Sequence, residues 1–344
     1  MQIPTQPRIL ITRLSAIGDC IHTVPLVTAI RKHYPRAHIA WATQGGPASL
    51  IQGIPGLDHV YQIERSWLRN LRSISHVRKL LRAGKFDVAI DPQSLTKSSL
   101  LGWLSGAKYR IGFTKGQARE ASPWLNNHRV APDTRHVVDR YLELLKPLGI
   151  VHPNVEFHIP AYASEAATMR SFLNTHGLSG FALLNPGAGW ESKRWPTERY
   201  ATVANHLMRQ HQLRSVVLWS GDRELEMAET ILAGAPEATV LAPSTTLPEL
   251  AELCRASRLF VGSDTGPMHL AAAVAIPCVA MYGPTEPEVC GPYGSAHESI
   301  QAYLQSGSSS ERRGEDNSAM QAITTEMVTA ACDRVIARAS RQAS

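Results

Sequence analysis

The sequence predicts an α/β protein with two domains, each built on a parallel β-sheet. Short apolar segments bounded by turn residues alternate with helix-like segments along the chain. This alternation is typical of parallel sheets that are covered by helices. A length of 344 residues suits two domains, and 44% hydrophobic residues are enough to fill two cores.

The predicted strands are short and apolar, and turn residues separate them from the predicted helices. The strands are expected at 8–14, 38–42, 60–63, 87–91, 110–112, 181–185, 214–219, 239–241, 259–262 and 278–282. The helices are expected at 26–33, 74–83, 137–148, 197–211, 224–232 and 247–256.

The alternation pauses where Pro153 and Pro160 bracket an extended stretch, and we place the domain linker there. We therefore expect one domain at residues 1–160 and a second at 161–304, with a cleft between them. Residues 305–318 are rich in Ser, Gly and charge, and we expect a flexible loop. We expect a C-terminal helix at 319–344 that packs back on the N-terminal domain.

Composition restricts the class of partner and compartment. The formal charge of +6 favours anionic partners such as nucleotides, phosphorylated glycans, lipid head groups or nucleic acid. Five cysteines without a C-x-x-C pair argue against a disulfide framework or a zinc ribbon. The sequence shows no signal-peptide core and no apolar run of about 18 residues. We expect a cytosolic globular enzyme or binding protein.

The loop after the first predicted strand reads SAIGD and contains Ser15, Gly18 and Asp19. Its spelling fits neither the dinucleotide-binding G-x-G-x-x-G pattern nor a P-loop. Asp19 either caps the following helix or projects as a base from the carboxyl end of the strand, where parallel sheets bind ligands. The residues alone leave these two interpretations equal.

The segment NPGAGWESKRWP, residues 185–196, follows another predicted strand. Gly187 and Gly189 expose backbone amides, and Lys193 and Arg194 bring cations to the same loop. This combination suits an anionic leaving group such as a diphosphate. The alternative is an ordinary turn with a solvated Lys-Arg pair.

The segment VGSDTGPMHLAAA, residues 261–273, ends a strand and begins a helix of small residues. Hydroxyls and amides at Thr265 and Gly266 favour phosphate, because a helix N-terminus attracts anions. Asp264 would repel phosphate, so we expect it to order the loop. His269 either faces the ligand or packs inside the domain.

Two further segments carry charge. Glu224 lies in the segment SGDREL after a predicted strand. It either binds ribose hydroxyls or simply lies at a helix N-terminus, where acidic residues are favoured. Residues 65–82 hold basic residues and no acid, at helical spacing. They either meet an anionic membrane surface or form a packed helix with a solvated basic face. The fourteen histidines are scattered and no ligand spacing stands out, so we expect no metal site.

These segments together resemble the ADP-heptose:lipopolysaccharide heptosyltransferases of glycosyltransferase family 9. The matching pieces occur in family order across about residues 8–287, and they are RLSAIGDCIHTVPLVTAIR, DVAIDPQSLTKSSLL, GQAREAS, NPGAGWESKRWPTERYA, SGDRELEMAETI and FVGSDTGPMHLAAAVAIPCVAMYGPTEP. The QSLTKS and ARE segments look most like heptosyltransferase I, whereas KRWP is closer to the second transferase. The resemblance implies the GT-B fold, in which two Rossmann-like domains face each other across a cleft.

The resemblance further implies an inverting transfer of heptose from ADP-L-glycero-D-manno-heptose to the Kdo/inner core of lipopolysaccharide, without a metal or other cofactor. Asp19 would be the general base, and Lys193 would stabilise the departing ADP. The C-terminal domain would bind the donor through Gly187, Gly189, Glu224, Asp264, Thr265, Gly266 and His269. The N-terminal domain would bind the acceptor through Ser15, Gly18, Lys97, Arg119 and Glu120.

Three alternatives remain open. One is a heptosyltransferase for a later core step or another glycan acceptor, because this chain has Ala188 and Gly189 where the first transferase carries hydroxyls. The second is a nucleotide-sugar epimerase on the same fold. The third, a nucleic-acid-binding protein, conflicts with an aromatic content of 6%. We therefore expect an ADP-sugar and a lipid A–Kdo acceptor as partners, contact with the inner membrane through Arg65–Arg82, and no nucleic acid.

Overall fold

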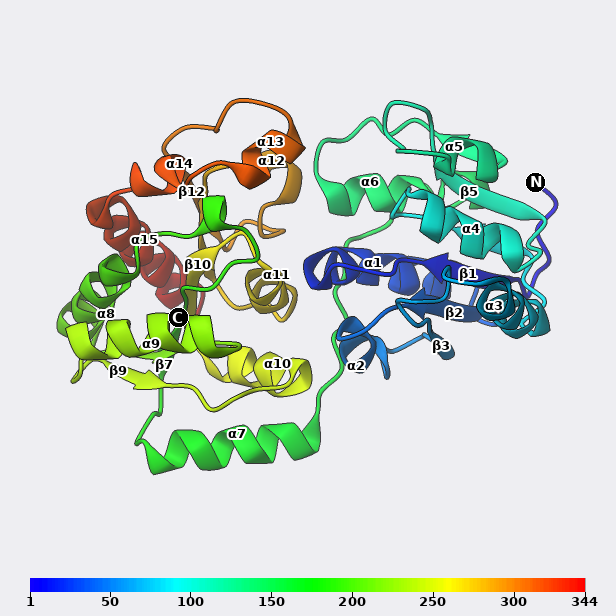
Figure 1. The fold of residues 1–344 in the computed structure, drawn as a ribbon. Helices are drawn as coiled ribbons and strands as arrows, with labels where there is room; N and C mark the ends of the chain where they lie inside the picture. Colours follow the sequence, from blue (N-terminus) through cyan, green and yellow to red (C-terminus); the bar gives the residue numbers. More distant parts are fainter. Residues whose placement is uncertain (344) are drawn as a thin grey trace. The chain divides into compact units, whose positions relative to one another are not determined.

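The computed structural model describes residues 1–343 and divides into two compact units, Met1–Pro160 and a second that starts at Ala161 (Figure 1). Each unit contains a six-stranded sheet in which all neighbouring strands are parallel. The strand order is β3-β2-β1-β4-β5-β6 in the first sheet and β12-β11-β10-β7-β8-β9 in the second. Both orders are the Rossmann order, and the predicted α/β class is confirmed.

The N-terminal unit alternates strands and helices from β1 onward. Its strands are β1 (Arg8–Thr12), β2 (His38–Thr43), β3 (His59–Gln62), β4 (Val88–Ile90), β5 (Tyr109–Phe113) and β6 (His128–Val130). Its helices are α1 (Ile17–His33), α2 (Pro47–Ile51), α3 (Leu71–Ala83), α4 (Thr96–Leu104), α5 (Ser122–Leu125), α6 (Val137–Glu143) and the 3₁₀ turn η1 (Lys146–Leu148). Leu10, Ala40, Ala89 and Leu101 belong to one buried core cluster, so β1, β2 and β4 pack against α4.

The C-terminal unit repeats this alternation and ends in a long helix. Its strands are β7 (Phe181–Asn185), β8 (Arg214–Val217), β9 (Thr239–Leu241), β10 (Leu259–Ser263), β11 (Cys278–Tyr282) and β12 (Glu298–Gln301). Its helices are α7 (Ala163–Thr175), η2 (Glu191–Lys193), α8 (Thr197–His211), α9 (Asp222–Gly234), α10 (Leu247–Ala256), α11 (Gly266–Ala273), α12 (Pro287–Cys290), α13 (Ser309–Gly314), α14 (Ser318–Gln321) and α15 (Thr325–Ala343).

The strongest apolar signals gave the correct elements, and the weakest were missed. All residues of β7 and β11 are buried, and both strands have the predicted bounds. The strands β6 and β12 were missed because each is short and half polar. Helix α1 begins at Ile17, nine residues before the predicted start, and continues through Pro25. The helix thus contains Pro25 in its interior, where proline usually breaks a helix.

The C-terminal region differs from two expectations. Helix α15 packs on α8, β11 and β12, so it belongs to the C-terminal unit. Its residues Val328, Cys332 and Val335 are at most 1% exposed and belong to the core of the C-terminal unit. The Ser-rich segment 305–318 is structured: it contains α13, and buried Gln305 donates to the Glu315 carboxylate at 2.6 Å.

Three further features concern membrane-spanning helices, the cysteines and helix α3. Within residues 1–343, no helix combines the length and the apolar character needed to cross a lipid bilayer. In the same range the five cysteines are free thiols, and all but Cys290 are buried. Helix α3 buries Val77 and Leu81, while Leu71 at its start is 84% exposed and does not belong to the buried face.

Candidate active site

The two sheets each have a switch point, where the chain order reverses between neighbouring strands. It lies between β1 and β4 in the N-terminal unit, and between β7 and β10 in the C-terminal unit. Parallel sheets bind ligands at the carboxyl ends of the strands at such points. The loops that leave these four strands contain the SAIGD segment, Asp91, the Lys193 segment and Asp264. Of the predicted site residues, Ser15, Gly18, Asp19, Lys193 and Asp264 therefore follow the carboxyl ends of these strands, whereas Arg119, Glu120 and Glu224 follow β5 and β8.

Asp19 lies in the first turn of α1 and has two partners. Its Oδ2 accepts a hydrogen bond from the backbone N–H of Ala16 at 3.2 Å and lies 2.5 Å from Nη2 of Arg13. Its side chain is 41% exposed, while Ser15 is half-buried and Gly18 is buried in the same turn. Asp19 thus stabilises the helix N-terminus as a cap would, yet keeps an accessible carboxylate.

Arg13 holds Asp19 in place and was missed by the sequence reasoning. Its guanidinium is 5% exposed, donates to the carbonyl of Pro92 at 3.1 Å, and lies 5.4 Å from the ring centroid of Tyr141. Burial lowers the pKa of Arg13, but the Asp19 carboxylate outweighs burial and raises that pKa above its ordinary value. Arg13 is therefore a fixed positive charge beside the candidate base.

A buried carboxylate organises the loop after β4. Asp91 is 2% exposed, and its Oδ1 accepts from the backbone N–H groups of Gln93 and Ser94 at 3.2 and 3.0 Å. The Oε1 of Gln93 in turn accepts from the N–H of Leu14 at 2.8 Å. The loop after β4 is thereby tied to the loop that carries Asp19, and neither Asp91 nor Gln93 had been singled out.

The three charged residues expected on the acceptor side gather at the start of α4. Lys97 lies in the first turn of this helix. The Glu120 carboxylate accepts from the N–H of Thr96 at 3.0 Å, and the N–H of Arg119 donates to the carbonyl of Ser94 at 3.0 Å. The hydrogen bonds from Thr96 lower the pKa of Glu120. The structure thus brings the side chains of two cations and one carboxylate to one helix N-terminus.

Lys193 is joined to Asp264 in the C-terminal unit. Its Nζ lies 2.5 Å from Oδ2 of Asp264, 3.3 Å from the Asp264 carbonyl, and 4.5 Å from the ring centroid of Trp190. The side chains are 13% and 7% exposed, respectively. The ammonium therefore lies at the carboxyl end of β10, with its charge balanced by a buried carboxylate.

Asp264 has further partners that fix its position. The hydroxyl of Thr285 donates to it at 2.9 Å, and Nε2 of His269 lies 3.0 Å from its Oδ1. Burial raises the pKa of Asp264, but His269 and Lys193 outweigh burial and hold that pKa well below its usual range. Asp264 is thus an ionised anchor that orders the loop, and His269 is a buried partner of it. Thr285 was missed.

The loops after β7 and β10 are joined by an amide. Nδ2 of Asn185 donates to Oγ1 of Thr265 at 3.2 Å and to the carbonyl of Gly187 at 3.1 Å. Thr265 is the N-cap of α11, and Gly266 is its first residue. The amide N–H groups of this first turn form a positive end suited to phosphate oxygens.

Glu224 lies against the backbone of Gly187. A Cβ added at Gly187 would lie 2.3 Å from Cδ of Glu224, whereas one added at Gly189 would meet nothing within 4 Å. Burial raises the pKa of Glu224, although its Oε2 accepts from the N–H of Ser220 at 2.9 Å. Glu224 therefore lies in the first turn of α9, binds the backbone just before that helix and lies beside the loop that follows β7, so both interpretations of this residue persist.

The segment that carries Lys193 is clamped by residues far along the chain. Nε1 of Trp195 donates to the carbonyl of Ile323 at 2.8 Å, and Arg199 donates to the same carbonyl at 2.6 Å. Nδ2 of Asn317 donates to the carbonyl of Arg194 at 2.9 Å. The residues that follow Lys193 are therefore held by a segment, 317–323, that begins at the end of the predicted loop.

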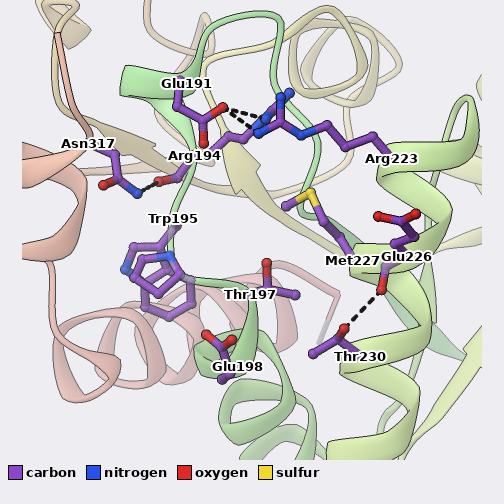
Figure 2. Close-up of a pocket in the computed structure, with 11 residues that line it drawn as sticks. Glu191, Arg194, Trp195, Thr197, Glu198, Arg223, Glu226, Met227, Thr230 and Asn317 are labelled. Carbon is purple, nitrogen blue, oxygen red and sulfur yellow. Dashed lines mark hydrogen bonds and ion pairs between the residues drawn. The ribbon is translucent and has the colours of Figure 1, made fainter.

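A pocket of about 390 Å³ lies beside this segment (Figure 2). Glu191 bridges Arg194 and Arg223 across it, at 2.6 and 2.7 Å. The pocket is lined by residues 191, 194–198, 223, 226, 227, 230 and 317. It therefore includes none of the predicted donor-binding residues, and its two arginines already share a carboxylate.

Comparison with known proteins agrees with the fold and gives the class of protein. The family model described as glycosyltransferase family 9 (heptosyltransferase) matches residues 74–319. The fold and the family match define a glycosyltransferase with two Rossmann-like units, the GT-B fold. The chain belongs to glycosyltransferase family 9.

The chain is also similar to individual relatives and to solved structures. The chain is 26% identical over 297 residues to the lipopolysaccharide core heptosyltransferase OpsX of Haemophilus influenzae, covering 85% of this chain and 84% of the relative. It is 28% identical to lipopolysaccharide heptosyltransferase 1 of Pseudomonas aeruginosa, covering 83% and 81%. A family 9 transferase structure from Veillonella parvula has a TM-score of 0.82 at 24% identity and covers 96% and 97% of the two chains. This structural likeness shows the fold.

Proposed function

We propose that this protein transfers a heptose from ADP-L-glycero-D-manno-heptose to the Kdo/inner core of lipopolysaccharide, with inversion at the anomeric carbon. The observation that carries the proposal is the Lys193–Asp264 pair at the switch point of the C-terminal unit. Family membership supports the reaction class. The likeness to a structure of E. coli heptosyltransferase WaaC with ADP-2-deoxy-2-fluoro heptose supports an ADP-linked donor.

The C-terminal unit would hold the donor. The Lys193 ammonium would weaken its ion pair with Asp264 and bind the diphosphate. The negative charge of the diphosphate grows as the glycosidic C–O bond breaks. The N-terminus of α11 at Thr265 and Gly266 would add amide donors to the same phosphates. Glu224, held against Gly187, would accept hydrogen bonds from the ribose hydroxyls.

The N-terminal unit would hold the acceptor and the base. The acceptor hydroxyl oxygen would attack the anomeric carbon, its proton would pass to Asp19, and ADP would leave with the bonding electrons. The fixed charge of Arg13 would keep the Asp19 carboxylate oriented. Lys97 and Arg119 would attract anionic groups of the acceptor.

We propose that the protein acts in the cytoplasm and meets the inner membrane through Arg65–Arg82. On α3 the side chains of Arg72, Arg78 and Lys79 are exposed, and so is Leu71 at the start of the helix. This basic face with an apolar tip suits an anionic lipid surface.

The test is a product assay with ADP-, UDP- and GDP-sugars, each offered with a deacylated lipid A–Kdo acceptor, and with mass analysis of the products. We expect one heptose to be added from the ADP donor alone. Transfer only to an acceptor that already carries heptose would assign a later core step and contradict the first-step proposal. Isomerised nucleotide-sugar formed without any acceptor would contradict transfer and indicate an epimerase.

A further inference from the structure

Helices α8 and α15 bring together two histidines and an aspartate that the proposed transfer does not use. Nε2 of His206 and Nε2 of His211 lie 2.8 and 2.7 Å from the same Oδ1 of Asp333. Within residues 1–343, this is the one group of three His, Cys, Asp or Glu side chains whose ligand atoms all lie within 4.8 Å of one another. Figure 1 shows α15 beside α8 in the C-terminal unit.

The chemistry of the three atoms matches a metal site. Two imidazole nitrogens and one carboxylate oxygen form a donor set used for zinc, and His206 and His211 have the H-x₃₋₅-H spacing found among zinc ligands. His211 is the last residue of α8, and Gln212 after it has a φ of 52°. The helix ends there, so the two rings can converge although four residues lie between them.

The distances require only a small adjustment. Ligand atoms bonded tetrahedrally to zinc lie roughly 3.4 Å apart, given metal–ligand bonds of about 2.1 Å. Each nitrogen–oxygen distance would therefore lengthen by about 0.6 Å. The side chains of His206, His211 and Asp333 are 25%, 22% and 44% exposed, so they can rotate and water can complete the coordination.

We propose that His206, His211 and Asp333 bind a divalent transition metal of the zinc class through Nε2, Nε2 and Oδ1. The ion would join α15 to α8. Helix α15 supplies Val328, Cys332 and Val335 to the core of the C-terminal unit, so the metal would stabilise that unit. Cys332 is the neighbour of Asp333, but it is fully buried in this core and takes no part.

The test uses full-length, untagged protein that has been treated with a chelator and then titrated with ZnCl₂ by calorimetry. We expect one equivalent of zinc to bind with a Kd in the micromolar range or tighter. Asp333→Asn keeps the side chain's shape and should weaken binding at least about 100-fold, because losing a ligand costs more than the 10–100-fold lost with an outer-shell partner. His211→Gln should do the same if Asp333→Asn fails to fold.

Two controls separate this site from others. His76→Ala removes an exposed imidazole from α3 in the N-terminal unit and should leave binding unchanged. Cys290→Ser should also leave it unchanged, because Cys290 is the one thiol of the described chain that is not fully buried. Cobalt(II) should give a visible absorption band in wild type that Asp333→Asn loses.

Zinc should also raise the Tm of the wild type and not that of His211→Gln, since binding to the folded state alone stabilises it. Absence of stoichiometric binding would overturn the proposal, as would binding that survives Asp333→Asn. The proposal would also be overturned if the stability depended on pH through these three residues but did not depend on zinc. The three side chains would then form an ion pair only.

Discussion

Lys193 and Asp264 form an ion pair at 2.5 Å with both side chains almost fully buried. The same ammonium is the expected partner of the donor diphosphate. On the proposed function, donor phosphate and Asp264 would compete for one cation. The hydrogen bond from Thr285 and the contact with His269 hold Asp264 in addition to Lys193. Asp264 would therefore keep both partners if Lys193 turned toward a ligand.

Asp264→Asn should destabilise the C-terminal unit by about 3 kcal/mol, because it leaves a buried ammonium without a counter-charge. For a unit of this size the Tm should fall by about 6–12 °C, measured by calorimetry. Asp222→Asn, which changes an exposed acid at the start of α9, is the control and should leave the Tm within about 1 °C. Equal Tm values for both variants would contradict a buried charge pair.

Asp19→Asn should lower kcat by about 100-fold or more, the range of a lost general base. The amide oxygen can still accept from the N–H of Ala16, so the stability of α1 should change by less than about 1 kcal/mol. Turnover with saturating acceptor and urea unfolding measure the two quantities. Full turnover in this variant would show that Asp19 is not the base. The control is Asp133→Asn, which changes an exposed acid of the same unit and should match wild type in both measurements.

Gly187→Ala should weaken ADP binding by about 10-fold or more, because the new methyl group would push the Glu224 carboxylate from its place. Gly189→Ala is the matched control, since a Cβ there meets open space. Calorimetric titration with ADP compares them. The ribose assignment of Glu224 would fail if both variants bound ADP alike.

The stability of the N-terminal unit should depend on Glu143 at acid pH. Burial raises the pKa of Glu143, but the ammonium of Lys146 and hydrogen bonds from Asp133 and Thr134 outweigh burial and lower that pKa to about 2. A folded-state pKa below the unfolded value gives stability above pH 4.5 that is lost as the pH falls toward 2, about 3 kcal/mol in all.

Urea unfolding of wild type and Glu143→Gln at pH 7 and pH 3 measures this. We expect a difference in the free energy of unfolding near 3 kcal/mol at pH 7 that shrinks at pH 3. A difference that stays constant with pH would show that the lost hydrogen bonds matter and the charge does not.

The sequence predicts the sheets and the position of the site because both depend on local patterns. Fully buried strands such as β7 read as apolar runs, and the residues after them must lie at the carboxyl edge of the sheet. Asp19, Lys193 and Asp264 could therefore be placed by their distance from a strand end.

Contacts between distant segments could not be predicted in this way. Arg13 was passed over although it adjoins the loop, because nothing local shows that its side chain turns toward Asp19. The partners of Asp264 include Thr285, and those of Asp333 on α15 include His206 and His211 on α8, so each set joins segments far apart in the sequence. Helix α7 was missed because its thirteen residues bury only Met169 and Leu173 and give a weak apolar period.

The contacts of residues 317–323 with the Lys193 segment affect when this segment can fold during synthesis. A ribosome releases the N-terminal unit first, and it can fold while synthesis continues. The carbonyl of Ile323 is made 128 residues after Trp195, its hydrogen-bond partner. The Lys193 segment can form these contacts only when residues 317–323 leave the exit tunnel. A nascent chain therefore cannot complete this segment before nearly all of the described chain has been translated.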